Sequence, residues 1–337
     1  MPQRVAITGF GYAVPPQIRT NYDPIFDWLR AHPVSNLFTG YQERRVLPAP
    51  DRQGTPPNTV ADLMVSACRD ALKEAELQSD EIDLLAGWAS ISEYLTPNAL
   101  SLVHKELGLR DDAWLLPVEG LENFSTALMT ADAMIKAERG RNSLVIKNAL
   151  VVAGCNWTQY VDYHTPQSAS AGDGAGAVVL ARTNRKGLFE LVDSRTEVMS
   201  TGYGGMFMQG DGVPAALPVA WSTPYFHITP AGVNAFNTFG KQAPVRVAQL
   251  LLKKHGLKGK DVTLIAHQAS RVLMNHWQAQ IQPGQYLDTM LEFANMVSAT
   301  VPVTFAYKYN HIDKDYVLFL NPSAEFKAVG ALLKRNS

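Results

Sequence analysis

The residue types and patterns that the sequence lacks are informative first. Only two of its 337 residues are cysteine, Cys68 and Cys155, which excludes a disulfide framework. No apolar run reaches the ~18–20 residues that a membrane-spanning helix needs, and the opening residues do not have the pattern of a signal peptide. Neither charge sign is in excess, because 30 Lys and Arg residues balance 31 Asp and Glu residues. We therefore expect a cytoplasmic protein that binds neither membranes nor nucleic acid.

The hydrophobic fraction of 46% is ample for a packed core. Apolar residues at helical spacing predict helices over residues 59–75, 125–136 and 245–254. Short apolar runs between them predict buried strands, at residues 5–8, 82–86, 143–154, 178–181, 262–266, 316–320 and 331–333. The alternation of the two element types indicates an α/β protein.

Two parts of the chain resemble each other. Residues 82–90 align with residues 262–270, residues 150–156 align with residues 316–322, and Asn123 aligns with Asn295. The pattern predicts two similar αβ units packed as one body, with an N-terminal half over residues 1–183 and a C-terminal half over residues 184–337.

A glycine-rich motif is the strongest local signal. Gly172, Asp173, Gly174 and Gly176 directly precede the apolar run of residues 178–180. Glycines at this density indicate tight turns or close backbone approach, and we favour a structural turn. A dinucleotide-binding motif would have its glycines after a strand and before a helix, so this role is not expected.

Two polar residues are candidates for chemistry. His267 follows the buried strand 262–266, at the carboxyl end where α/β sheets gather catalytic groups. It is either a general base or hydrogen-bond donor, or a hydrogen-bonded core histidine. Asn295 lies among small residues, where it either directs its amide into a cavity or serves packing.

The sequence gives weaker signals for other kinds of catalytic or metal site. No His or Cys residues have the spacing of a metal site, and there is no Gly-x-Ser-x-Gly nucleophile motif. Glu119 and Glu122 precede the helix of residues 125–136, where capping of the helix N-terminus is the simplest role for Glu122. Cys155 ends an apolar strand, and Cys68 belongs to the apolar face of a helix.

Taken in order, these segments resemble the β-ketoacyl-ACP synthase III branch of the thiolase superfamily over nearly the whole chain. The glycine motif resembles the family's Gly-Asp-Gly-Ala-Gly-Ala, and His267-Gln268-Ala269 resembles its His-Gln-Ala. Asn295 with residues 298–302 is similar to its Gly-Asn-x-Ser segment, with one residue more between Asn and Ser. The resemblance implies a five-layer αβαβα fold of two duplicated halves, usually dimeric.

The departures from the family pattern are as informative as the matches. Leu121 stands where the family has its reactive cysteine, so a covalent acyl-enzyme cannot form at that position. The family's Gly-x-Gly loop near the oxyanion hole is replaced by Ser323, Ala324 and Glu325, followed by Phe326, and the glycine before the family's Asn is Ala294. The resemblance therefore implies a site that keeps its His and Asn, has lost its nucleophile and has a changed oxyanion hole.

Three functions follow from the resemblance. The first is an enzyme that uses His267 and Asn295 for acyl transfer, condensation or malonyl-type decarboxylation of a CoA or acyl-carrier-protein thioester, in a specialised fatty-acid or polyketide-type pathway. Glu119 or Glu122 would serve as acid or base, Cys155 is a candidate for a displaced nucleophile, and no permanently bound cofactor or metal is expected. The second is a non-catalytic partner that forms a heterodimer with an active homologue instead of a homodimer, and the third is a thioester-binding module. For the enzyme, we expect a tunnel that leads from the surface to a pocket beside Leu121.

Overall fold

The computed structural model describes residues 4–33, 37–48, 59–92, 96–137, 145–209 and 225–337. Its main feature is a mixed sheet of ten strands in the order β12-β11-β13-β14-β8-β1-β7-β6-β4-β5. The strands are β1 (Arg4–Ala13), β4 (Leu84–Ala89), β5 (Trp114–Pro117), β6 (Asn148–Asn156), β7 (Asp173–Thr183), β8 (Phe189–Val198), β11 (Val262–Ala266), β12 (Gln285–Leu287), β13 (Tyr316–Pro322) and β14 (Lys327–Arg335).

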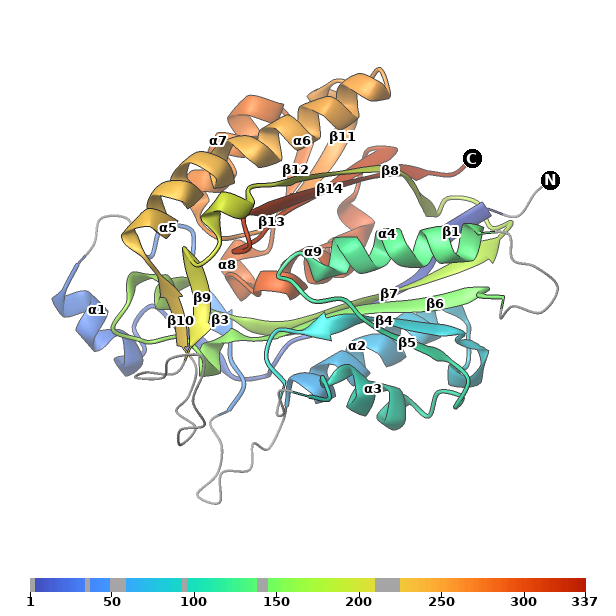
Figure 1. Ribbon diagram of the computed structural model, residues 1–337, viewed down its shortest axis with the longest axis horizontal. Coiled ribbons are helices and arrows are strands. Elements are labelled where there is room, and N and C mark those ends of the chain that lie inside the picture. The colour runs from blue at the N-terminus through green and yellow to red at the C-terminus, as the bar shows by residue number, and fades with distance from the viewer. Residues whose placement is uncertain (1–3, 34–36, 49–58, 93–95, 138–144, 210–224) are drawn as a thin grey trace.

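Helices cover the strands in three layers (Figure 1). The lower layer holds α2 (Val60–Ala75) and α3 (Leu100–Leu107), and the upper layer holds α6 (Lys241–Lys254) and α7 (Arg271–Ile281). The middle layer holds α4 (Asn123–Lys136) and α9 (Thr300–Tyr307), each of which contacts strands from both halves of the sheet order. The result is the mixed α/β architecture in five layers that the family resemblance implies.

Smaller elements complete the described chain. They are β2 (Ile18–Thr20), β3 (Glu43–Arg45), β9 (Met206–Gln209), β10 (Tyr225–Ile228), α1 (Asp27–Ala31), α5 (Pro230–Ala235) and α8 (Met290–Phe293). Among the described residues, none of the helices combines the length and apolar character of a membrane span.

The order of strands repeats within the sheet. From one edge it runs β5-β4-β6-β7-β1, and from the other edge β12-β11-β13-β14-β8, with the same parallel and antiparallel pairings at corresponding places. The two series meet at the pairing of Ile7 with Phe189. This repetition supports the proposed duplication, and the proposed boundary after residue 183 falls between β7 and β8.

The glycine motif does not form the turn that the sequence favoured. Asp173 to Ala177 already belong to strand β7, where the glycines allow close backbone approach instead. A Cβ on Gly176 would lie 2.7 Å from the backbone of Pro302 in α9, and one on Gly174 would lie 2.7 Å from the Met296 sulfur. The missing side chains let β7 lie directly against the segment that carries α9.

This close contact predicts the effect of a methyl group on stability. We expect Gly176→Ala to lower the free energy of unfolding by about 1–3 kcal/mol, because the Pro302 backbone must move away. Urea unfolding followed by circular dichroism measures the change. Gly187→Ala is the control, since a Cβ there has no atom within 4 Å and only its φ of +80° opposes the substitution. Equal losses in both variants would contradict the packing argument.

Candidate active site

The His-Gln-Ala segment continues strand β11 beyond its buried end. The backbone N–H of His267 donates to the carbonyl of Leu320 in β13 over 3.0 Å, which fixes the start of the segment. Gln268 is fully buried, and its amide donates to the Ala294 carbonyl over 2.7 Å. The Tyr41 hydroxyl donates to the Ala269 carbonyl over 2.8 Å. The segment is thus held from three sides.

Gln268 also connects His267 to the loop that carries Asn295. Its side-chain oxygen accepts a 2.7 Å hydrogen bond from the Thr289 backbone N–H. Together with the hydrogen bond to the Ala294 carbonyl, this bond attaches Gln268 to the residues on both sides of helix α8 (Met290–Phe293). The sequence did not single out Gln268 except as part of the motif, although a polar residue directly after a buried strand was a usable signal.

The electrostatic environment keeps the imidazole of His267 neutral at neutral pH. Burial lowers its pKa to about 4, while the facing Val297 backbone acts in the opposite direction, towards the protonated form. A backbone group that favours the protonated ring does so through its carbonyl oxygen. A neutral imidazole has one N–H and one acceptor nitrogen, so His267 can exchange a proton or donate one hydrogen bond.

Asn295 lies where the two halves of the chain meet. Its backbone N–H donates to the Ser170 carbonyl over 2.9 Å, and its carbonyl accepts from the Gly172 N–H over 3.1 Å. Its side-chain oxygen accepts from the Val297 N–H over 2.9 Å. The side-chain nitrogen donates to no other residue within the described ranges, which leaves the amide N–H groups of Asn295 free for a ligand.

The glycine motif positions this asparagine. A Cβ on Gly172 would lie 2.3 Å from the Phe293 carbonyl oxygen, so only glycine permits the pairing with Asn295. Asp173 is buried and accepts hydrogen bonds from the backbone N–H groups of Leu47 and Thr158, at 2.7 and 2.9 Å. Burial raises the pKa of Asp173 to about 6.

Two residues around Asn295 have left-handed backbone angles that favour glycine. Ala294 has φ +58° and ψ −138°, at the position where the family pattern has glycine. Val297 has φ +46°, which is unusual for a β-branched residue. Val297 falls within the one-residue insertion before Ser298 that the sequence showed, and the insertion brings its carbonyl towards His267.

Leu121 lies at the N-terminus of helix α4. It stands between Gly120, whose φ is +116°, and Glu122, which precedes the first helical residue. Glu122 does not cap the helix, contrary to the sequence interpretation, because its side chain accepts no bond from the helix backbone. It is only 2% exposed and forms an ion pair with Lys327 at 2.6 Å, and this buried pairing prevails over capping.

The turn between β13 and β14 packs on the same end of α4. The Ser323 N–H donates to the Lys327 carbonyl over 2.8 Å and closes the turn. Asn321, at the start of the turn, donates a 3.0 Å side-chain hydrogen bond to Ser125 in the first turn of α4. Ala324 is partly buried, and Phe326 is buried with φ +52°. The altered loop and Leu121 are therefore neighbours.

The remaining candidates are less favourably placed. Cys155 is fully buried, its thiol contacts the Gly172 carbonyl at 3.6 Å, and burial raises its pKa. A buried thiol with a raised pKa is a weak nucleophile, which argues against a displaced nucleophile. Glu119 is exposed. Within the described residues, no group of three or more side chains has the composition of a metal site.

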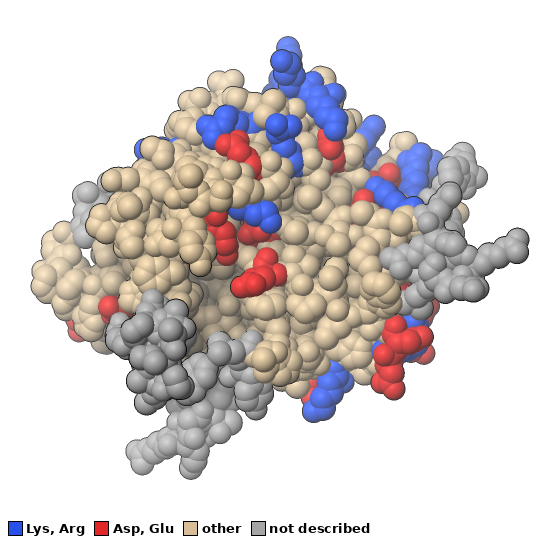
Figure 2. All heavy atoms as spheres, viewed as in Figure 1, with Lys and Arg blue, Asp and Glu red and all other residues tan. Residues whose placement is uncertain are grey.

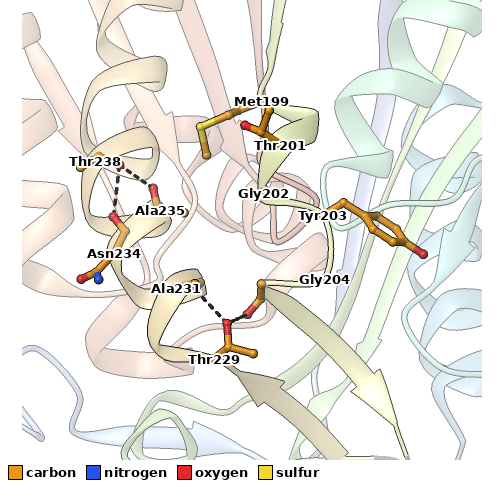
Figure 3. Close-up of a pocket in the computed structure, with 12 residues that line it drawn as sticks. Met199, Thr201, Gly202, Tyr203, Gly204, Thr229, Ala231, Asn234, Ala235 and Thr238 are labelled. Carbon is orange, nitrogen blue, oxygen red and sulfur yellow. Dashed lines mark hydrogen bonds between the residues drawn. The ribbon is translucent and has the colours of Figure 1, made fainter. Parts of the chain in front are cut away.

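A pocket of about 480 Å³ lies beside the altered loop. It is lined by the segment from Met199 to Gly205 and by residues from Thr229 to Thr238 (Figure 3). Tyr203, 97% exposed, points away from it. A Cβ on Gly202 would lie 2.4 Å from the Phe326 ring, so this pocket adjoins the β13–β14 turn. Leu121, His267 and Asn295 do not line it, and the tunnel expected beside Leu121 stays a prediction.

The face of the molecule that Figure 2 shows is mostly uncharged. Figure 2 shows acidic and basic side chains intermixed at its upper edge, with a small mixed group near the centre of the face. No continuous basic stripe is visible on this face, in agreement with the balanced charge of the sequence.

Comparisons with known proteins agree with this fold. The family model described as 3-Oxoacyl-[acyl-carrier-protein (ACP)] synthase III matches residues 121–197. The chain is 27% identical to a β-ketoacyl-ACP synthase III of Syntrophomonas wolfei, over 98% of this chain and 97% of that protein. It superposes on 3-oxoacyl-ACP synthase III of Aquifex aeolicus with a TM-score of 0.79 and 21% identity, covering 98% of this chain and 99% of the other. The priming β-ketosynthase of the R1128 polyketide pathway gives a TM-score of 0.80 at 21% identity, covering 99% of this chain and 97% of the other.

The lowered pKa of His267 predicts a pH dependence of stability. The unfolded chain binds a proton near pH 6.5 and the folded chain only near pH 4, so the free energy of unfolding falls as the pH falls through this window. The full effect is about 3 kcal/mol. We expect His267→Asn to lose less stability than the parent between pH 7 and 4.5, in urea unfolding at both pH values. The exposed His311→Asn variant is the control, and equal pH dependence of parent and His267→Asn would refute the assignment.

The backbone of Ala294 predicts a stabilising substitution. Ala294→Gly relieves a conformation that costs roughly 1–3 kcal/mol for a residue with a side chain, against an entropic cost of about 0.5–1 kcal/mol. We expect the melting temperature and the free energy of unfolding to rise. Ala133→Gly, at an exposed position inside helix α4, is the matched control and should destabilise. A loss of stability in Ala294→Gly would show that the left-handed backbone is not strained.

Proposed function

Because the chain belongs to the β-ketoacyl-ACP synthase III-like proteins of the thiolase superfamily, we propose that it acts on an acyl thioester without forming a covalent acyl-enzyme. The substrate is a malonyl-type thioester of CoA or acyl carrier protein, and no permanently bound cofactor takes part. His267 and Asn295 bind the thioester carbonyl oxygen. The enzyme serves a specialised fatty-acid or polyketide-type pathway, because priming of the family's usual kind needs the cysteine that Leu121 replaces.

The observation that carries this proposal is the free amide nitrogen of Asn295, held in a loop that Gln268 ties to His267. Asn295 is only 4% exposed as a residue, yet its amide nitrogen is not among the buried side-chain atoms without a partner in the described part of the chain, so this nitrogen faces space that a ligand can reach. A ligand oxygen would satisfy it. Fixed donors of this kind stabilise a negative charge that develops on a carbonyl oxygen.

The reaction that suits these groups is decarboxylation. The bond between the malonyl carboxylate carbon and the adjacent methylene carbon breaks, CO₂ leaves, and the electron pair moves through the methylene carbon to the thioester oxygen. Asn295 donates to the resulting enolate oxygen, and His267 shares its single N–H between this oxygen and the Val297 carbonyl. A proton then adds to the carbon, or the enolate attacks an acyl thioester that is not bound covalently to the enzyme.

A non-catalytic partner subunit is the second candidate, and one observation favours it. Strand β5 is an edge of the sheet, and it exposes Trp114 and Leu115, which are 44% and 38% accessible. An apolar edge strand is a surface on which another chain pairs. Either a second copy of this chain or a homologue could bind at this edge. If the chain is the proposed enzyme, we expect a homodimer.

The decisive experiment is turnover of malonyl-CoA. We expect the purified protein to release CO₂ and to form acetyl-CoA, and we expect His267→Ala and Asn295→Ala each to lower the rate about 10²- to 10³-fold through loss of one donor. Chromatography of the CoA thioesters measures both products. The molar mass from light scattering on the same sample distinguishes a homodimer from a monomer.

Two controls accompany these variants. His311→Ala, at an exposed position outside the proposed site, should retain the parent rate. Cys155→Ala should also retain it, because the buried thiol takes no part. If His267→Ala turns over malonyl-CoA as fast as the parent does, the enzyme proposal fails. If the parent is inactive but copurifies with an active homologue, the partner role replaces it.

A further inference from the structure

Tyr41 holds the segment that carries His267. Its side chain is buried just before strand β3, and the residue is only 5% exposed. The hydroxyl donates to the Ala269 carbonyl over 2.8 Å, two residues beyond His267. Because this segment directly follows the end of strand β11, the hydrogen bond fixes the direction in which the chain leaves the sheet.

Arg44 holds the segment that pairs with Asn295. Its Nε donates to the Ala169 carbonyl over 2.8 Å, and its Nη2 donates to the same oxygen atom. The carbonyl of the next residue, Ser170, accepts the backbone N–H of Asn295 over 2.9 Å, and Ala171 forms a parallel bridge with Asn295. Arg44 is thus separated from the Asn295 backbone by one residue and one hydrogen bond.

The Asn21 side chain joins Tyr41 to Arg44. Its nitrogen donates to the Tyr41 carbonyl over 2.8 Å, and its oxygen accepts from Nη1 of Arg44 over 2.6 Å. The two side chains are therefore parts of one hydrogen-bond network. Their bonds to Ala269 and Ala169 hold two backbone segments that lie far apart in the sequence at a set separation.

The Arg44 guanidinium is an unusual group to find in the core. The residue is fully buried, and its hydrogen bonds go to uncharged oxygen atoms, with no carboxylate in an ion pair with it in the described part of the chain. The cation lies over the rings of Phe26, Phe38 and Tyr41, with 5.0, 5.6 and 5.7 Å to the ring centres. Burial of a cation is costly. The hydrogen bonds that a charged donor makes are stronger than neutral ones, so the Ala169 carbonyl is held firmly.

We propose that Tyr41 and Arg44 are positioning residues that set the separation between His267 and Asn295. Neither side chain touches the substrate, and each acts through a backbone carbonyl next to a donor-bearing segment. This inference rests on the proposed thioester function, because the separation matters when both donors bind one enolate oxygen. A donor displaced by about 1 Å can cost on the order of 10²-fold in rate.

The first test is the kinetic effect of two conservative variants. Tyr41→Phe removes only the hydroxyl, and we expect it to lower kcat for malonyl-CoA decarboxylation about 10-fold. Arg44→Lys keeps the charge but cannot donate from two nitrogens of one planar group, so kcat should fall in the same way. KM should stay unchanged in both variants, because the lost alignment matters when charge develops in the transition state.

Matched controls remove comparable hydrogen bonds elsewhere. Tyr163→Phe removes a hydroxyl that donates to the Thr158 carbonyl over 2.9 Å. Arg182→Lys changes a guanidinium that donates to the Ile135 carbonyl from the other end of strand β7. Both controls should keep the kcat of the parent, and circular dichroism checks that every variant is folded.

A double variant distinguishes positioning from a purely structural role. In the His267→Ala background, we expect Tyr41→Phe to change kcat by less than about 2-fold, because the donor that it positions is gone. A general structural weakening would lower kcat by the same factor in both backgrounds, since effects of independent sites multiply in the rate.

Hydrogen exchange tests the positioning without any turnover. We expect the backbone of residues 267–271 to exchange faster in Tyr41→Phe, and that of residues 294–297 to exchange faster in Arg44→Lys. Mass spectrometry of peptides measures both, and the two controls should exchange as the parent does. If the parent fails to decarboxylate malonyl-CoA, the proposed function fails, while the exchange result still decides whether these residues hold the two segments.

Three outcomes would overturn the proposal. They are parent-like exchange of these segments in both folded variants, equal losses of kcat in the variants and their matched controls, and an equal effect of Tyr41→Phe with and without His267.

Discussion

The rest of the structure depends on the close approach of strand β7 to the segment before helix α9. Gly172, Gly174 and Gly176 leave out the side chains that would meet Phe293, Met296 and Pro302. Without this contact, the Asn295 backbone could not pair with Gly172, and the N-terminal and C-terminal strand series would not share one middle layer. The constraint is steric and local, yet it sets the position of Asn295, a candidate site residue from the opposite half of the chain. The glycine motif therefore acts by permitting a short distance between two backbone segments, and this role involves no ligand.

The site consists of two separately supported parts. His267 and Asn295 are held by Gln268, Tyr41 and the glycine strand. Leu121 and Glu325 are held by the contacts between helix α4 and the β13–β14 turn. Because the two parts have separate supports, a change in one need not disturb the other. This separation gives a physical reason why a chain without the nucleophile can keep the His267 and Asn295 pair, which we propose acts on an enolate.

The sequence predicted elements well where burial alone decides structure. Strand β11 begins and ends where its apolar run does, and helix α2 has the predicted face. Strand β8 was missed because many of its residues are polar, and it is defined by its pairing with β14 along its length and with β1 at Phe189. The glycine motif was placed in a turn, since spacing does not reveal which distant backbone lies opposite. The candidates Asn295 and Glu325 were visible as residues, but Gln268, Lys327 and the Val297 carbonyl act through contacts between segments far apart in sequence. The roles of His267 and Asn295 stay predictions.

The one-residue insertion at Val297 affects the two proposed enolate donors, His267 and Asn295, unequally. A neutral imidazole has a single N–H, and the Val297 carbonyl that faces His267 competes with a substrate oxygen for it. Asn295 has no such competitor, because its oxygen is already bound by the Val297 N–H and its nitrogen has no partner in the described part of the chain. Because of the insertion, the N–H of the His267 imidazole is partly used in a contact with the Val297 carbonyl, whereas the Asn295 amide nitrogen is available to a ligand. When negative charge develops on a bound thioester, it favours the protonated imidazole, which has two N–H groups and can serve both acceptors. In the proposed reaction, the donor strength of His267 would thus rise as the enolate forms, which is the condition for stabilising a transition state more than a ground state.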